Sequence, residues 1–183
     1  MEFYTRLRSC KIHKAGKIAY NQATKGTKQM WHGEILQIGI SPSAGQLIQI
    51  VDQVHAVPGK GLEGDRYFSN KGTYEPSPDG SRQVTLIESE ALAALSSETG
   101  IQLKPGESRR NLVTRGVPLN HLVGKEFNVG TVRLRGVRLC EPCKHLVEIT
   151  GQAGVLPGLT HRGGLRAEIL SDGIIQVGDS VSE

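Results

Sequence analysis

The sequence TVRLRGVRLCEPC, residues 131–143, contains the pattern on which the fold prediction rests. Apolar residues alternate with arginines up to Leu139, and the alternation slips once, at Gly136. A period of two is typical of a half-buried β-strand, and a slip at a glycine indicates a bulge. Pro142 lacks the amide hydrogen that a sheet ladder needs. We therefore predict a bulged strand that ends at about the first cysteine and leaves Cys143 on a turn.

The two cysteines of this stretch, Cys140 and Cys143, are candidates for chemistry. Side chains on turns are often free to react, and the cationic neighbours Arg138, Lys144 and His145 favour a thiolate. The alternative is that both cysteines are small buried apolar residues, because cysteine is among the most buried residue types. A single CxxC pair does not decide between the two interpretations.

Further short strands, separated by glycine and proline, are predicted on both sides of this stretch. They are expected at 33–40, at 47–57 as a bent strand or a strand pair, at 83–87, at about 111–114 and in a hairpin over 127–139. Asp172-Gly173 between two apolar runs predicts a final hairpin. Residues 88–99, rich in alanine and leucine, predict the one clear helix, which Gly100 would end. Many short strands and 23 glycines indicate a mainly β fold, a closed barrel-like single domain with short helical decorations.

The charge of the chain is unevenly distributed. Residues 1–30 contain seven of the 22 basic residues and one of the 18 acidic residues, which leaves residues 31–183 with a net charge of −2. We interpret residues 1–30 as a disordered basic extension and residues 31–183 as the folded domain. The alternatives for the extension are an arm that binds RNA or a membrane, and a segment that precedes a start at Met30.

The composition also excludes several classes of function. A nucleic-acid partner is not expected, because a slightly acidic folded domain lacks the basic surface that such a partner needs. No run of eighteen apolar residues predicts a membrane span, and the first thirty residues show no apolar signal-peptide core. Three cysteines, an odd number, favour a reducing compartment over a disulfide scaffold. We therefore expect a cytoplasmic protein.

Five segments, in this order, resemble the MOSC family, whose domains are related to the C-terminal part of molybdenum cofactor sulfurases. The segments are Pro58–Arg66 (PGKGLEGDR), Arg109–Leu112 (RRNL), Cys140–Leu146 (CEPCKHL), His161–Ala167 (HRGGLRA) and Gln176–Val181 (QVGDSV). The similarity spans roughly residues 31–183. It implies a mainly β, barrel-like fold that binds the molybdenum cofactor (molybdopterin).

The resemblance implies roles for particular side chains. Cys143 matches the cysteine that coordinates molybdenum or carries sulfur, and a thiolate is a suitable soft ligand. His145 beside it is a candidate for moving protons, although such a histidine is often an ordinary surface residue. Contacts to the phosphate and pterin are implied for Arg109, Arg110, Asn111, Lys60, Asp65 and Arg66.

Arginine suits this task because its forked guanidinium can form two bonds to a phosphate. For Arg109 and Arg110 the alternative is a solvated strand edge. Arg162 is a further candidate, because Gly163 and Gly164 would let the backbone approach a ligand closely. The alternative for this segment is a turn into the last hairpin.

We therefore predict a molybdenum oxidoreductase that reduces N-hydroxylated compounds, such as hydroxylamino-purines or amidoximes. Besides its small-molecule substrate it would need an external electron-donor protein, because no cysteine spacing typical of an iron–sulfur cluster is present. The alternative is a sulfur carrier, in which Cys143 receives sulfur from a donor and delivers a persulfide to metal–sulfur centres.

Two other types of cysteine site compete with these predictions. A thiol–disulfide oxidoreductase would place the CxxC pair at the start of a helix in a βαβ unit. A zinc site could use Cys140, Cys143, His145 and His161, but the second tight ligand pair of structural zinc sites is absent from this spacing. Neither pattern is complete in the sequence.

The charge split gives a first testable prediction. Deleting residues 1–29 should leave the melting temperature unchanged, because the segment contains too little periodic apolar sequence to contribute to a core. Calorimetry of the full chain and of a chain starting at Met30 measures this. A drop of several degrees in the shortened chain would show that the extension packs on the domain.

Overall fold

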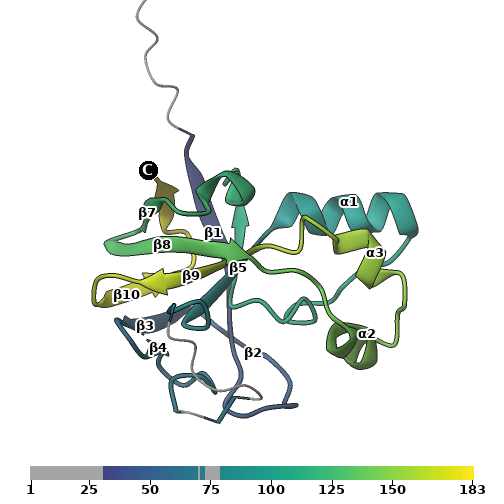
Figure 1. Ribbon diagram of the computed structural model, residues 1–183, viewed down its shortest axis with the longest axis horizontal. Coiled ribbons are helices and arrows are strands. Elements are labelled where there is room, and N and C mark those ends of the chain that lie inside the picture. Colours follow the sequence, from purple (N-terminus) through teal and green to yellow (C-terminus); the bar gives the residue numbers. More distant parts are fainter. Residues whose placement is uncertain (1–30, 70, 73–78) are drawn as a thin grey trace, which may run out of the picture.

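The structure is a computed structural model that describes residues 31–69, 71–72 and 79–183 (Figure 1). The predicted basic extension, residues 1–30, lies outside the described residues. The strands are β1 (Gly33–Ile40), β2 (Gln49–Val51), β3 (Gln53–Val57), β4 (Gly61–Leu62), β5 (Val84–Glu88), β6 (Leu112–Arg115), β7 (Glu126–Val129), β8 (Val132–Leu139), β9 (Leu165–Ile169), β10 (Gly173–Gln176) and β11 (Ser180–Ser182). The helices are α1 (Ser89–Thr99), η1 (Leu119–Leu122), α2 (Lys144–Thr150) and α3 (Val155–Leu159).

Seven strands form a closed barrel in the order β11-β7-β8-β9-β5-β6-β1, and β1 pairs with β11 to close it. Neighbouring strands are antiparallel except β5 and β6, which are parallel. β2 continues the sheet beside β1, and β10, β3 and β4 form a second, three-stranded sheet. The helices α1, α2 and α3 lie together on one side of the barrel (Figure 1). The predicted mainly β, closed single-domain fold is confirmed.

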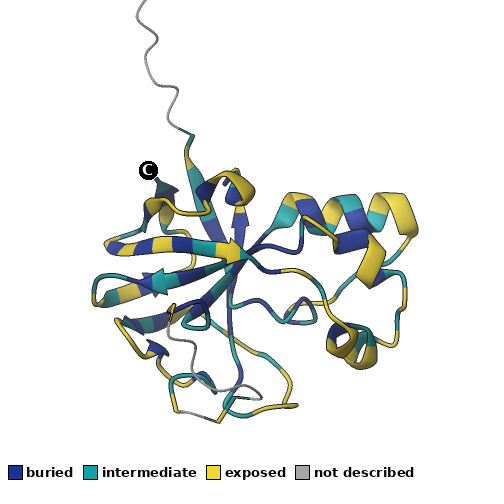
Figure 2. Cartoon of the chain, in the orientation of Figure 1, coloured by how far each residue is buried: buried dark blue, intermediate teal, exposed yellow. Residues whose placement is uncertain are grey.

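Two apolar clusters hold the fold together. The first fills the barrel and includes Ile35, Leu86, Leu112, Phe127 and Leu134, all of them buried. Buried and exposed residues alternate along β8, as the sequence pattern predicts (Figure 2). The second cluster lies beneath the helices, where side chains of α1 and α3 pack on the outside of β5 and β6. Burial of these side chains supplies the main driving force for folding.

The irregularity predicted in β8 is a β-bulge. The register between β8 and β9 shifts between Gly136 and Arg138. A Cβ atom added to Gly136 would lie 2.1 Å from the carbonyl oxygen of Leu122, so only glycine fits at this close approach. The hairpin of β7 and β8 is also confirmed, with Val129 opposite Val132.

The predicted helix is confirmed to within one residue. It ends at Gly100, whose φ of 74° is left-handed and whose N–H donates to the carbonyl oxygen of Ser96. Among the described residues, no helix combines the length and the apolar character needed to cross a bilayer.

The hairpin predicted at Asp172-Gly173 is wrong. β9 pairs with β8 and β5, whereas β10 pairs with β3. Contacts distant in sequence redirect the chain at this turn: the N–H of Arg133 donates to Ser171 Oγ, and Asp172 Oδ1 lies 3.0 Å from His55 Nε2. The turn is present, but tertiary contacts direct the following strand into the second sheet.

A histidine of β3 is held between two carboxylates, one of which belongs to this turn. His55 Nδ1 lies 3.3 Å from Glu63 Oε2, and its Nε2 lies 3.0 Å from Asp172 Oδ1. The hydrogen bond to Asp172, followed by the one to Glu63, raises the pKa of His55 above its ordinary value of 6.5. Protonated His55 therefore links β3 to the residues before β10 and after β4.

A pH dependence of stability follows, and its sign is fixed by the direction of this shift. A group with a raised pKa in the folded state contributes stability below its unfolded pKa, and loses that contribution as pH rises through the folded pKa. Urea unfolding of the wild type and of His55→Gln should therefore differ most below about pH 6.5 and converge at pH 8.5. Asp172→Asn should show the same trend, and a difference independent of pH would contradict the prediction.

Candidate functional site

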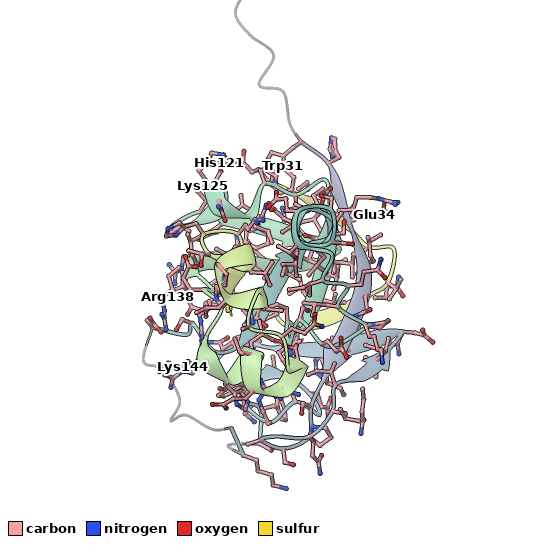
Figure 3. All side chains as sticks on the ribbon, turned by 90° about the vertical axis from the view of Figure 1, so that its right-hand side faces the viewer. Trp31, Glu34, His121, Lys125, Arg138 and Lys144 are labelled. Atoms are coloured by element: carbon pink, nitrogen blue, oxygen red, sulfur yellow. The ribbon has the colours of Figure 1, made fainter. Side chains whose placement is uncertain are left out.

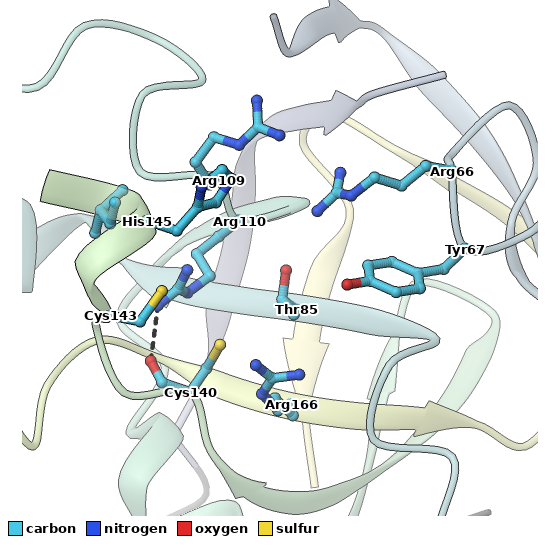
Figure 4. Close-up of a pocket in the computed structure, with 10 residues that line it drawn as sticks. Arg66, Tyr67, Thr85, Arg109, Arg110, Cys140, Cys143, His145 and Arg166 are labelled. Carbon is cyan, nitrogen blue, oxygen red and sulfur yellow. Dashed lines mark hydrogen bonds between the residues drawn. The ribbon is translucent and has the colours of Figure 1, made fainter. Parts of the chain in front are cut away.

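A pocket lies on the outside of the barrel, beside β5 and β9 and the turn that follows β8 (Figure 4). It contains about 640 Å³ of empty space, part of which is open to solvent. Its lining residues come from five separate segments of the chain: Arg66, Tyr67, Thr85, Arg109, Arg110, Cys140, Cys143, His145, Leu146 and Arg166. The structure thus brings together both cysteines, His145 and three of the predicted arginines.

The two cysteines differ strongly in exposure. Cys140 is 3% exposed, and its N–H donates to the carbonyl oxygen of Gly164 at 2.7 Å. Cys143 is exposed and is the residue immediately before α2. β8 ends at Leu139, as predicted, because Pro142 in the following turn cannot extend the ladder. The geometry therefore makes Cys143 the accessible thiol of the pair.

The helix after Cys143 is short. α2 spans seven residues, and it leads through α3 to β9, which is antiparallel to β8. A thiol–disulfide oxidoreductase of the βαβ type would need a parallel return strand. The described part of the chain does not provide that setting at the cysteine pair.

Arg110 is buried beneath the pocket and is bonded to the backbone. Its Nε donates to the carbonyl oxygen of Gly163 at 2.8 Å, its Nη2 to that of Cys140 at 2.7 Å, and its Nη1 to that of Ser108 at 3.2 Å. These three bonds fix the cysteine turn against the start of β9. Arg110 was predicted to contact the cofactor, but the protein itself uses much of its donor capacity.

Asn111 and Asp65 lie behind the pocket rather than in its lining. Asn111 Oδ1 accepts hydrogen bonds from the N–H and the hydroxyl of Thr85, at 3.1 and 2.8 Å. Its Nδ2 donates to Asp65 Oδ2 at 3.3 Å, and the same oxygen accepts the N–H of Ser41 at 3.1 Å. Both residues therefore hold in place the loop that carries Arg66.

Arg66 lines the pocket with a donor that the protein does not use. Its side chain is 14% exposed, and its guanidinium carbon lies 4.9 Å from the centre of the Tyr67 ring. Its Nη1 is buried without a hydrogen-bond partner, because the nearest carboxylate oxygen, of Asp65, is 3.5 Å away. A buried N–H group without a partner is costly, so this donor is suited to a bound anion.

Arg109 has an unusual backbone conformation. Its φ of 59° is left-handed, a region that residues other than glycine seldom adopt. Its guanidinium donates to the carbonyl oxygen of Gln46. Burial lowers the pKa of Arg109, and the nearby cation of Arg66 lowers it further. The two arginines repel each other, and an anion between them would relieve this repulsion.

Arg166 was missed by the sequence analysis, although it lies within the segment HRGGLRA. It is opposite Thr85 of β5 and opposite Arg138 of β8, so two cations are cross-strand neighbours. Within the described residues its side chain has neither a hydrogen bond nor an ion pair. Figure 3 shows Arg138 and Lys144 on the same side of the molecule. Like charges in register are unfavourable without an anionic partner.

Two of the predicted contact residues lie elsewhere. Lys60 is exposed, and its Nζ lies 5.7 Å from the centre of the Phe68 ring. Arg162 donates to the carbonyl oxygen of Gly158 at 2.7 Å and forms an ion pair with Glu98. Neither side chain lines the pocket, so neither is placed to contact a ligand there.

The glycines after Arg162 approach the protein itself rather than a ligand. A Cβ atom on Gly164 would lie 1.9 Å from the carbonyl oxygen of Leu86, and one on Gly163 would lie 2.6 Å from that of Cys140. The pair allows the chain to enter β9 directly beneath the cysteine turn. His161, two residues before Gly163, faces Glu141, and its Nδ1 lies 3.2 Å from Glu141 Oε1.

The donor set of the pocket suits one type of ligand. Four arginines and His145 line it, and none of the described residues in its lining is acidic. Among the described residues, no group of three or more His, Cys, Asp or Glu side chains could hold a metal ion unaided. A metal at Cys143 would therefore bring its own ligands. A phosphate-bearing cofactor with sulfur ligands fits these residues, and the Nη1 of Arg66, which has no hydrogen-bond acceptor, supports the fit.

Comparisons with known proteins identify the fold and the family. Solved structures with the same fold include the YUAD protein from Bacillus subtilis (16% identity, TM-score 0.68, covering 84% of this chain and 97% of that chain). YiiM from Geobacillus stearothermophilus (16%, 0.63, 82% and 75%) and YiiM from Escherichia coli (16%, 0.58, 84% and 68%) are also similar. No curated protein matches the sequence. The sequence profile of the MOSC domain matches residues 51–182, and the chain therefore belongs to the MOSC domain family, which is associated with binding of the molybdenum cofactor.

Proposed function

We propose that this protein binds the molybdenum cofactor in the arginine-lined pocket, with Cys143 as the protein ligand, and reduces N-hydroxylated compounds there. The observation that carries the proposal is an exposed thiol in a pocket whose described lining includes four arginines and no acidic residue. Thiolate is the soft ligand that molybdenum prefers, and guanidinium is the best side chain for phosphate. The thiol and the arginines line the same pocket.

The arginines would have different roles in binding the cofactor. Arg66 and Arg109 offer guanidinium groups to the cofactor phosphate, and Arg66 has an unused buried donor for it. Arg166 would add charge from β9, while Arg110 acts mainly through the cysteine turn that it fixes. Charge-assisted hydrogen bonds of this kind are worth about 1.5–3 kcal/mol each.

His145 is the lining residue suited to proton delivery. Reductive cleavage of an N–O bond consumes two electrons and two protons and releases water. When bound, the cofactor supplies the redox-active centre for the electrons, which an external donor protein would provide. His145 lines the pocket, is 46% exposed and lies 3.7 Å from Glu148, so it is accessible both to solvent and to a bound substrate.

The alternative function is transfer of sulfur. It is supported by the exposure of Cys143, because a donor protein must reach the thiol to leave a persulfide on it. A sulfur carrier needs the accessible cysteine but not the anion-binding arginines. The arginines thus favour the cofactor-dependent function. A reducing cytoplasm, expected from the sequence, suits either function.

Replacement of each cysteine in turn tests the proposal. Cys143→Ala should abolish retention of molybdenum and reductase activity with little change in stability, because the residue is exposed. Cys140→Ala should lower the free energy of unfolding by about 1 kcal/mol and spare most of the molybdenum, because this side chain is almost completely buried. Elemental analysis of protein from a cofactor-producing host, with turnover of an amidoxime, measures both.

Other outcomes would select a different function. Equal loss of activity in both variants, with a disulfide in the resting protein, would support a dithiol mechanism. A Cys143→Ala protein that keeps its molybdenum but accepts no sulfur from a desulfurase would support the sulfur carrier.

The strained backbone of Arg109 can be measured separately from its charge. A left-handed φ costs a residue with a side chain on the order of 1 kcal/mol, whereas glycine adopts it freely. Arg109→Gly should therefore be about 1 kcal/mol more stable than Arg109→Ala in urea unfolding, although both lack the guanidinium. Both should bind inorganic phosphate more weakly than the wild type.

The same pair of substitutions at Arg138 is the control. Arg138 lies in β8, where glycine weakens a strand relative to alanine, so the order of stability should reverse. An Arg109→Ala protein as stable as Arg109→Gly would show that no strain is stored at this position.

A further inference from the structure

A second depression adjoins the arginine pocket. It contains about 550 Å³ of empty space, part of it open to solvent, and Arg109 belongs to the lining of both. Four of its eight described lining residues have apolar side chains. Its lining residues are Leu47, Ile48, Lys104, Pro105, Gly106, Glu107, Arg109 and Ile149.

Its apolar side chains are unusually exposed. Leu47, in the loop between β1 and β2, is 84% exposed, and Ile149, near the end of α2, is 36% exposed. Single exposed apolar residues are common on protein surfaces and need no explanation. These two come from segments about a hundred residues apart in sequence and line the same depression, which is typical of a binding surface.

The floor of the depression is formed before any ligand binds. Gly106 packs so closely on Ile48 that an added Cβ would lie 2.8 Å from the Cβ of that residue. The turn that carries Gly106 is closed by a hydrogen bond of 2.8 Å from the N–H of Lys104 to Glu107 Oε2. A rigid floor lowers the entropy cost of binding, and this favours a small ligand.

The position of α2 relates this depression to the thiol. α2 begins directly after Cys143 and contains Ile149, so the rise of the helix separates the two residues by about 9 Å. A molecule with its reacting group near Cys143 could therefore place a ring system against Ile149 and Leu47. Between the two ends it would pass Arg109.

We propose that this depression is a subsite for an apolar ring system of the substrate, whose N-hydroxylated end lies in the arginine pocket. The identity of the ligand as a substrate rests on the proposed function, whereas the binding of an apolar ring system in the depression does not. Its continuity with the pocket through Arg109 favours the substrate over a second copy of this chain or another protein as its occupant.

The subsite is tested without the cofactor by titrating the full chain with anilinonaphthalene sulfonate. This fluorescent probe joins apolar rings to an anionic group that Arg109 or Lys104 can bind. Leu47→Ser and Ile149→Ser should each weaken binding by about three- to tenfold, since each removes part of the apolar contact. Ile174→Ser is the matched control, because Ile174 is 45% exposed on β10 and lines neither depression.

The outcomes of this titration are distinct. Unchanged binding in the Leu47 and Ile149 variants, or an equal loss in the Ile174 variant, would overturn the proposal. The proposal is also overturned if these substitutions leave probe binding unchanged and abolish self-association in sedimentation. The occupant would then be a second copy of the chain.

The substrate class is tested with a matched pair of compounds, a naphthyl amidoxime and acetamidoxime, bound to molybdenum-loaded protein in a calorimeter. Leu47→Ser should raise the dissociation constant of the naphthyl compound by about three- to tenfold and leave that of acetamidoxime unchanged. An equal change for both compounds would overturn the assignment. A protein that retains no molybdenum would contradict the proposed function, but the result of the probe titration would still stand.

Discussion

The site depends on one buried cation that has no carboxylate partner among the described residues. Arg110 is 7% exposed, and the carbonyl oxygens of Ser108, Cys140 and Gly163 accept its hydrogen bonds. These carbonyls belong to the residues before β6, the end of β8 and the entry to β9. Removing the guanidinium would leave them unsatisfied, at a cost of about 1–3 kcal/mol for each buried group. The place of Cys143 on the surface therefore follows from an interaction beneath it.

The same arrangement determines the electrostatics of the pocket. Arg110 is neutralised by no acidic residue, and the pocket receives further positive charge from Arg66, Arg109 and Arg166. Acidic residues elsewhere pair with other arginines on the surface, as Glu168 does with Arg135. Residues 31–183 therefore carry a slight net negative charge and still present a strongly positive pocket. Net charge describes the domain, whereas the local field is set by where the charged groups lie.

Elements with local causes were predictable from the sequence. β1, α1 and the hairpin of β7 and β8 match their predicted ranges, because alternation, helix formers and a glycine cap act between near neighbours. The bulge at Gly136 and the exposed turn at Cys143 were predicted for the same reason. The prediction of a final hairpin was wrong because the turn at Asp172 is held by His55, more than a hundred residues away in sequence.

By itself the sequence determined the strand pattern, the barrel class and the end of β8 before Cys143, since these follow from periodicity and from the proline beside the thiol. Only the tertiary structure decided which polar residues face the pocket. Asn111 turns inward because Thr85 and Asp65 satisfy its amide, whereas Arg166 lines the pocket as a cation with no acidic partner among the described residues. The physical reason is that a polar side chain's role depends on its hydrogen-bond partners, and here those partners come from distant parts of the chain.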